Sequence, residues 1–166
     1  MTTEQVTERA NRRIDALLSE YGESHRNPQN KFIHWIAVPV IFWTVVAILW
    51  SLPVPDFMAA TPYLNWASIT LVLTVLYYFS LSWTLALGMV LFSGLCFWIA
   101  AFYEQAEAGF PLWQFALLVF VIAWIFQFIG HKIEGRKPSF FKDIQFLLIG
   151  PAWLMSFIYK KLGLPV

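Results

Sequence analysis

The sequence predicts an all-α integral membrane protein, folded as one membrane domain over residues 1–166, and two observations support this class. First, the chain is 59% hydrophobic and only 13% charged, which is too apolar for a water-soluble domain of 166 residues. Second, all eleven Lys and Arg residues lie at or before Lys31 or at or after Lys132. The residues between them carry no cation, as expected of segments that cross a bilayer, where Lys and Arg are costly.

This apolar block divides into four predicted transmembrane helices, because a bilayer core about 30 Å thick needs about 20 apolar residues per helix. The first span is expected to start at Asn27-Pro28, where Asn27 can cap a helix that has proline at its first position. The stretch from Asn65 to Tyr103 is nearly twice one bilayer thickness, so we expect two helices joined by a tight turn near residues 80–83. The four expected spans are about 28–52, 65–82, 84–103 and 112–131.

Two more segments flank these spans. Residues 1–27 are expected to form a cytoplasmic amphipathic segment, which either lies on the membrane interface or caps the bundle as a soluble helix. Its apolar positions at helical spacing are Val6, Ala10, Ile14, Leu17 and Leu18. Residues 144–159 are short for a span and are interrupted by Gly150-Pro151. They favour a re-entrant or interfacial hairpin, with a short fifth hydrophobic helix as the alternative.

The charge pattern also predicts an orientation. Lys and Arg concentrate on the cytoplasmic side of membrane proteins, so the N-terminus is expected in the cytoplasm. His25 and His34 lie at the front of the cation-free block and His131 at its back, and the chain has no other histidine. Because an even number of crossings returns the chain to its starting side, all three imidazoles are expected at the cytoplasmic membrane face. A bacterial inner membrane is favoured for so compact a chain, with the endoplasmic reticulum as the eukaryotic alternative.

Polar groups accompany these histidines along the chain. Asn30 lies four residues before His34, so the two share a helix face and fit a metal ligand with its hydrogen-bonding partner. Gln127, His131 and Glu134 likewise share one face of the fourth helix, which is expected to continue past the membrane. Three imidazoles that converge in a partly dehydrated site suit Fe(II), zinc or copper.

Each of these residues also has a simpler interpretation. A single histidine at a membrane interface is most often an amphipathic anchor. Glu134, followed by Arg136 and Lys137, fits the solvated end of a helix, and Tyr21 fits an interface aromatic. The spacing alone therefore leaves both interpretations open, although polar groups at membrane depth tend to be functional.

Composition and motifs exclude several other classes. A net charge of +1, with no basic helix carrying interleaved aromatics, argues against nucleic-acid binding. Cys96 is the only cysteine, so disulfides within the chain and thiolate metal clusters are excluded. Three histidines are far fewer than the repeated boxes of membrane di-iron desaturases contain. The motifs of zinc proteases, serine hydrolases and phosphate-binding loops are also missing.

Two blocks of residues together resemble the membrane 2-hydroxy fatty acid dioxygenases, a family long catalogued as a domain of unknown function. The first block is Tyr21…His25-x-Asn27-x-x-Asn30-x-x-x-His34, followed by Val38-Pro39 and Phe42-Trp43-Thr44. The second is Gln127-Phe-Ile-Gly130-His131…Arg136-x-Pro138, followed by Asp143 and Gly150-Pro151. The middle spans are similar to the family only in hydropathy. Ser139 and Gly150 depart from the alanines expected beside Pro138 and Pro151, without touching an expected ligand.

The resemblance implies an Fe(II)-dependent step of fatty acid α-oxidation. A long-chain 2-hydroxy fatty acid and O2 would give the acid one carbon shorter, CO2 and water, without an external reductant. By this resemblance, the expected iron ligands and catalytic residues of this chain are His25, His34 and His131. Six neighbours are expected to orient the ligands or to bind the acidic head group: Tyr21, Asn27, Asn30, Gln127, Glu134 and Arg136.

Two rival interpretations remain open at this point. The chain could be a non-catalytic binding or structural membrane protein whose histidines are anchors, or a haem or zinc protein that uses two or three of them. The sequence also leaves open the acyl chain length, a free acid or thioester substrate, and a role for Glu134 as a ligand. The oligomeric state is open as well, a homo-oligomer included.

Overall fold

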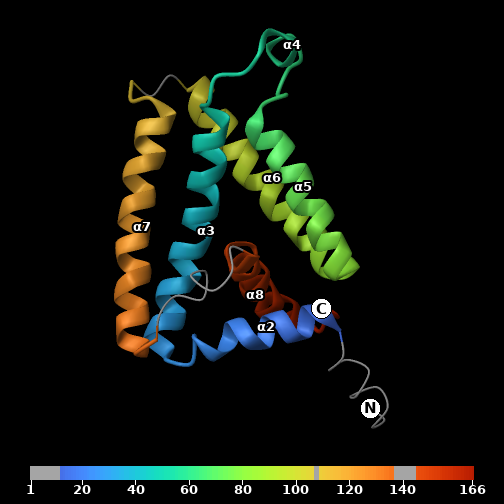
Figure 1. Cartoon of the computed structure of the whole chain (residues 1–166), viewed down its shortest axis with the longest axis vertical. Helices are drawn as coiled ribbons and strands as arrows, with labels where there is room; N and C mark the ends of the chain where they lie inside the picture. The colour runs from blue at the N-terminus through green and yellow to red at the C-terminus, as the bar shows by residue number, and fades with distance from the viewer. Residues whose placement is uncertain (1–11, 107–108, 137–144) are drawn as a thin grey trace.

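The computed structural model describes residues 12–106, 109–136 and 145–166, and every regular element in these ranges is an α-helix. The predicted all-α class is confirmed for this part of the chain. The helices are α2 (Arg13–Glu23), α3 (Pro28–Trp50), α4 (Asp56–Ala59), α5 (Trp66–Leu81), α6 (Trp83–Gln105), α7 (Leu112–Glu134) and α8 (Gln145–Leu162). α3 and α7 stand side by side, the α5–α6 pair leans away from them, and α2 and α8 lie across the lower end (Figure 1).

Three of these helices are long and apolar enough to cross a membrane: α3, α6 and α7, with 23 residues each. The remaining predicted span, 65–82, forms α5, an apolar helix of 16 residues. Large apolar side chains on the long helices are exposed, among them Phe32, Leu91 and Phe126. Exposed apolar surface of this extent is expected where helices face lipid.

Local sequence explains where these helices begin. Asn27 caps α3 as predicted, because its side-chain oxygen accepts a hydrogen bond from the Gln29 N–H while Pro28 takes the first helical position. Ser82 alone separates α5 from α6, and its hydroxyl accepts a hydrogen bond from the Leu85 N–H at the start of α6. The predicted tight turn between these two helices is therefore confirmed.

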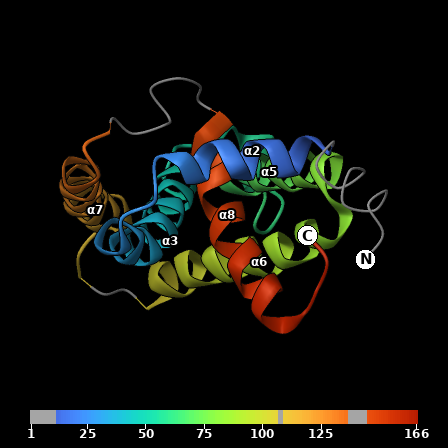
Figure 2. The same cartoon turned by 90° about the horizontal axis from the view of Figure 1, so that it is seen from below.

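The amphipathic helix expected at the N-terminus is confirmed as α2, which crosses the end of the bundle where α3 begins (Figure 2). α2 packs against α8 and buries Ile14 and Tyr21. Val6 and Ala10, which were expected on the same apolar face, lie outside the described residues.

The C-terminal segment is one continuous helix, so the expected hairpin at Gly150-Pro151 is wrong and the alternative, a short hydrophobic helix, is what forms. Proline inside a helix removes one backbone hydrogen bond and crowds the carbonyl four residues before it, but Pro151 does not end α8. Packing, not a turn, explains Gly150, because a Cβ at this position would lie 2.9 Å from the hydroxyl oxygen of Tyr21. α8 can therefore approach α2 closely.

Small residues bring α3, α6 and α7 together at the end of the bundle away from α2. The buried cluster there consists of Ala47, Ala100, Leu112 and Ala116. Alanine at such positions lets helix backbones approach closely, which is how helices associate in a medium as apolar as their own side chains.

Candidate metal centre

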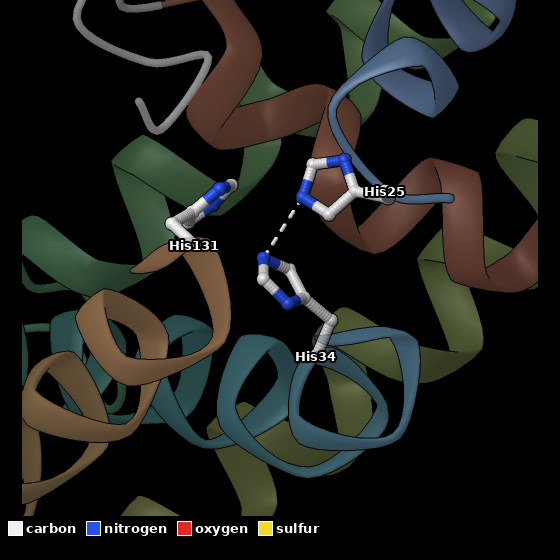
Figure 3. A group of neighbouring side chains, drawn as sticks. All are labelled: His25, His34 and His131. Carbon is white, nitrogen blue, oxygen red and sulfur yellow. Dashed lines mark hydrogen bonds between the residues drawn. The ribbon is translucent and has the colours of Figure 1, made fainter. Parts of the chain in front are cut away.

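The three histidines, far apart in the sequence, lie together at the end of the bundle where α2 and α8 cross. His25 comes from the link between α2 and α3, His34 from the second turn of α3, and His131 from the last turn of α7 (Figure 3). All three are buried. Each offers one nitrogen, and these atoms lie within 4.8 Å of one another.

The break at Asn27-Pro28 makes this convergence possible. On one continuous helix, His25 and His34 would point to opposite faces, because successive residues turn by about 100°. The chain instead ends α2 at Glu23 and starts α3 at Pro28, so His25 folds back over the start of α3. Its ring then lies 4.2 Å, centroid to centroid, from the ring of His34.

Hydrogen bonds fix which nitrogen of two rings carries the proton. Nδ1 of His25 lies 2.6 Å from the carbonyl oxygen of Tyr21, and Nδ1 of His34 lies 2.9 Å from the carbonyl oxygen of Asn30. A carbonyl oxygen can only accept, so Nδ1–H donates in both rings. In the neutral imidazole, Nε2 is then left with its lone pair.

These two Nε2 atoms face each other at 2.9 Å (Figure 3). Two lone pairs at this distance repel unless a cation lies between them. A proton is a poor candidate at neutral pH, because burial lowers the pKa of His25 to about 4, although its bond to the Tyr21 carbonyl opposes the shift. Nitrogen ligands about 2.0–2.1 Å from a metal ion lie about 3 Å apart in adjacent positions, so the pair fits a metal.

His131 completes the set. Its ring centroid lies 5.0 Å from that of His25 and 4.9 Å from that of His34. Its Nδ1 is buried and has no hydrogen-bond partner in the described part of the chain. Three neutral imidazoles with accessible nitrogens are a donor set that iron, zinc and copper all accept.

Glu134 stabilises this arrangement through backbone contacts, with both of its oxygens already engaged. Its Oε1 accepts from the Arg26 N–H and its Oε2 from the Asn27 N–H, each at 2.8 Å. Oε2 also accepts from the Asn30 side-chain amide at 3.0 Å. A carboxylate at the exposed N–H groups of a helix start is favourable, so Glu134 clamps the end of α7 onto the start of α3.

Asn30 connects this clamp to the histidines. Its carbonyl accepts the Nδ1–H of His34, while its side-chain amide donates to Glu134 and to the Ser24 carbonyl. Gly130 makes room for it, because a Cβ there would lie 2.5 Å from Asn30 Oδ1. Hydrogen bonds of this kind hold the rings of metal-binding histidines in orientation.

Aromatic rings cover the other side of His25. Tyr21 stacks on it, with ring centroids 4.2 Å apart and an interplanar angle of 10°. Trp153 of α8 lies 5.2 Å from the same ring. Sequence reasoning singled out Tyr21 but missed Trp153, because an aromatic residue in an apolar segment is equally typical of lipid contact.

A cavity of about 190 Å³ adjoins the histidines, and its lining includes His34, His131 and Gln127. Gln127 is buried, and its Oε1 has no hydrogen-bond partner among the described residues. A buried acceptor of this kind costs free energy unless something donates to it. The cavity therefore offers a hydrogen-bond acceptor within the same space as two of the histidines.

The two remaining predicted residues, Asn27 and Arg136, do not line the cavity. The Asn27 side chain caps α3 while its backbone N–H donates to Glu134, and Arg136 is exposed. The part of the second block after Arg136 lies outside the described residues, including Lys137, Pro138, Ser139 and Asp143.

The chain is similar in sequence to known proteins over most of its length. Residues 12–162 match the Mpo1-like family, described as 2-hydroxy-palmitic acid dioxygenase Mpo1-like. The chain is also 30% identical over 148 residues to the 2-hydroxy-palmitic acid dioxygenase MPO1 of Saccharomyces cerevisiae (strain ATCC 204508 / S288c). That alignment covers 88% of this chain and 79% of the yeast protein. No solved structure matches the chain.

Proposed function

Because the chain belongs to the Mpo1-like family, we propose that it is an Fe(II)-dependent dioxygenase of fatty acid α-oxidation. It would convert a long-chain 2-hydroxy fatty acid and O2 to the fatty acid one carbon shorter, CO2 and water. The family resemblance predicted from two short blocks is confirmed, and it extends over residues 12–162.

The observation that carries this proposal is the pair of Nε2 atoms of His25 and His34, 2.9 Å apart with both Nδ1 protons donated to carbonyls. His25, His34 and His131 are the proposed iron ligands. When bound, the iron would supply the redox chemistry with O2 and a positive charge for the 2-hydroxy acid. The protein's own contribution is to hold three neutral imidazoles in place and to keep water from a buried site.

Gln127 is the proposed contact of the substrate head group. It lines the same cavity as His34 and His131, and its Oε1 needs a donor. A 2-hydroxyl group is such a donor, and a fatty acid without it leaves the acceptor unpaired. Among the described residues no Arg or Lys lines the cavity, and we propose that the substrate carboxylate faces the metal.

We further propose four membrane crossings, with the histidine end at the cytoplasmic face. The support is geometric: α3, α6 and α7 exceed the about 30 Å of a bilayer core, and the shorter α5, about 24 Å at 1.5 Å per residue, runs back toward the histidine end in contact with α3 and α6 (Figure 1). The cations at the start of α3 and the end of α7 also lie at one end of the bundle (Figure 1). Positive residues at a single face favour the cytoplasmic side.

The activity is tested with protein purified without oxygen in detergent, loaded with Fe(II), and supplied with 2-hydroxypalmitic acid and O2. We expect O2 consumption and formation of the acid one carbon shorter, in equal amounts, and no turnover of palmitic acid itself. Zinc-loaded protein serves as the matched control and should be inactive. Stable zinc or haem binding with no turnover of the iron form would instead support the rival interpretations.

A further inference from the structure

The cavity beside the histidines continues away from them along one face of α3. Its wall there includes His34, Val38, Ile41, Val45 and Leu49, spaced three or four residues apart. From His34 to Leu49 the helix rises about 22 Å, at 1.5 Å per residue. The hydrocarbon core is about 30 Å thick, and the acyl chains of one leaflet occupy half of it. The rise from His34 to Leu49 exceeds this half.

The opposite wall is one face of α5, formed by Ala67, Thr70, Leu71 and Thr74. α5 runs antiparallel to α3 (Figure 1), so Thr74 lies toward the histidine end and Ala67 toward the far end. Ala67 is fully buried there in a cluster with Val46. α3 and α5 therefore face each other at the far end of the cavity, and Phe146 and Gly150 of α8 line it together with the histidines.

Polarity changes from one end of this cavity to the other. The histidine end holds His34, Gln127 and His131, whereas the far end is lined mainly by apolar side chains, among them Val46, Leu49 and Ala67, with Thr70 one helical turn from Ala67. A molecule that fits this gradient has a polar head and an apolar tail.

The cavity also reaches the outer surface of the bundle. Val45 lines it and is 40% exposed, and Thr70 on the facing helix is exposed as well. The two lie on helices that face lipid, so an amphiphile can enter sideways from the bilayer. Its head then reaches the histidines without the tail crossing water.

We propose that this cavity is the acyl-chain channel, with the substrate head at the histidines and its methyl end near Leu49, and that Leu49 and Leu71 set the chain length accepted. The identity of the head group rests on the proposed function, whereas the channel rests on the cavity and its walls. Contact between each methylene group and the apolar wall favours binding, so an unfilled or blocked far end changes the preferred length.

The first test is a matched pair of substitutions on α5. Leu71→Trp narrows the channel, and Leu73→Trp makes the same change two residues away, where the side chain is 62% exposed and outside the cavity. For Leu71→Trp we expect turnover of long relative to short 2-hydroxy acids to fall about tenfold, the effect of losing contact with about two methylene groups. Leu73→Trp should keep the wild-type ratio.

Leu49→Ala tests the same idea in the opposite direction, because it lengthens the far end. It should shift the preference toward longer acids, a gain that misfolding does not produce. If Leu71→Trp and Leu49→Ala both retain the wild-type length preference while turning over substrate, the channel assignment is wrong and the dioxygenase assignment stands.

A turnover-independent experiment separates the two hypotheses. A 2-hydroxy fatty acid with a diazirine at its methyl end is bound to the inactive zinc-loaded protein and photolysed, and the labelled residues are mapped by mass spectrometry. Labels within residues 45–49 and 67–71 support the channel even if no turnover is ever found. Labels confined to the lipid-facing residues of α6 and α7 would overturn it.

Discussion

α3 and α7 pack against each other along their length, but their two ends are held by different forces. Away from α2, three alanines and Leu112 form a buried apolar cluster. At the other end, Glu134 accepts three hydrogen bonds from the start of α3, and two histidines place facing lone pairs at the centre. The apolar end holds the helices by packing alone, whereas the polar end would be completed by the proposed metal ion. The apolar contacts that hold α3 and α7 together and the residues of the candidate metal site therefore lie at opposite ends of this helix pair.

The largest effect that distinguishes the two ends is expected from His131→Ala. Removing one of three nitrogen donors should abolish iron retention and turnover, because two imidazoles leave the ion weakly held. Iron content after gel filtration and O2 consumption measure this. Phe128→Ala, on the lipid-facing side of the same helix and 49% exposed, is the control and should retain both. Full activity in His131→Ala would refute the ligand assignment.

Glu134→Gln should have the next largest effect. The side chain keeps its size but loses the charge that faces the N–H groups of Arg26 and Asn27, so the start of α3 and the Asn30–His34 contact loosen. Metal affinity should fall about 10- to 100-fold, as for other residues that orient ligands. Competition against a chelator measures it. Glu104→Gln, an exposed change near the opposite end of the bundle, should leave the affinity unchanged.

A substitution at the apolar end is expected to change stability without changing metal affinity. Ala116→Leu overfills the contact between α3 and α7 and should lower the free energy of unfolding by about 1–3 kcal/mol. Metal affinity of the folded protein should stay at the wild-type value. A parallel loss of affinity would mean that the two ends are coupled, and the separation described above would be wrong.

The smallest effect is expected at Gly130, inside the polar end. Gly130→Ala places a Cβ against Asn30 Oδ1, so the side chain must shift, at a cost of about 1 kcal/mol. Metal affinity should fall with it, because Asn30 positions His34. Gly94→Ala is the matched control, since a Cβ there meets nothing within 4 Å and improves helix propensity. If the two variants bind metal with equal affinity, Asn30 does not position His34.

The charge pattern and the expected even number of membrane crossings were enough to predict much of this arrangement. The cation-free block located three long apolar helices, the Asn27-Pro28 pair located the start of α3, and the expected even number of crossings predicted that the three histidines share one end. What spacing did not reveal was contact. Whether His25 folds back depends on the exact course of a short link, and the facing Nε2 atoms depend on which carbonyl each Nδ1 meets.

The errors have a common physical origin. Gly150-Pro151 was interpreted as a turn, but glycine also serves close packing, and here it accommodates Tyr21. Trp153 and the channel walls went unnoticed because residues that face lipid, a substrate chain or a neighbouring helix are all apolar. Hydropathy cannot separate these three environments, whereas few environments are compatible with a polar residue in an apolar helix.

The bonds to Glu134 have a consequence for biosynthesis. Arg26 and Asn27 leave the ribosome 108 and 107 residues before the carboxylate that accepts their N–H groups. At about 5–20 residues per second, the start of α3 waits roughly five to twenty seconds for its partner, hydrated at the membrane surface. α3, α5 and α6 can therefore be inserted before the centre exists. Loading with the proposed metal would then be a late step, open only to a chain whose last long helix has been synthesised.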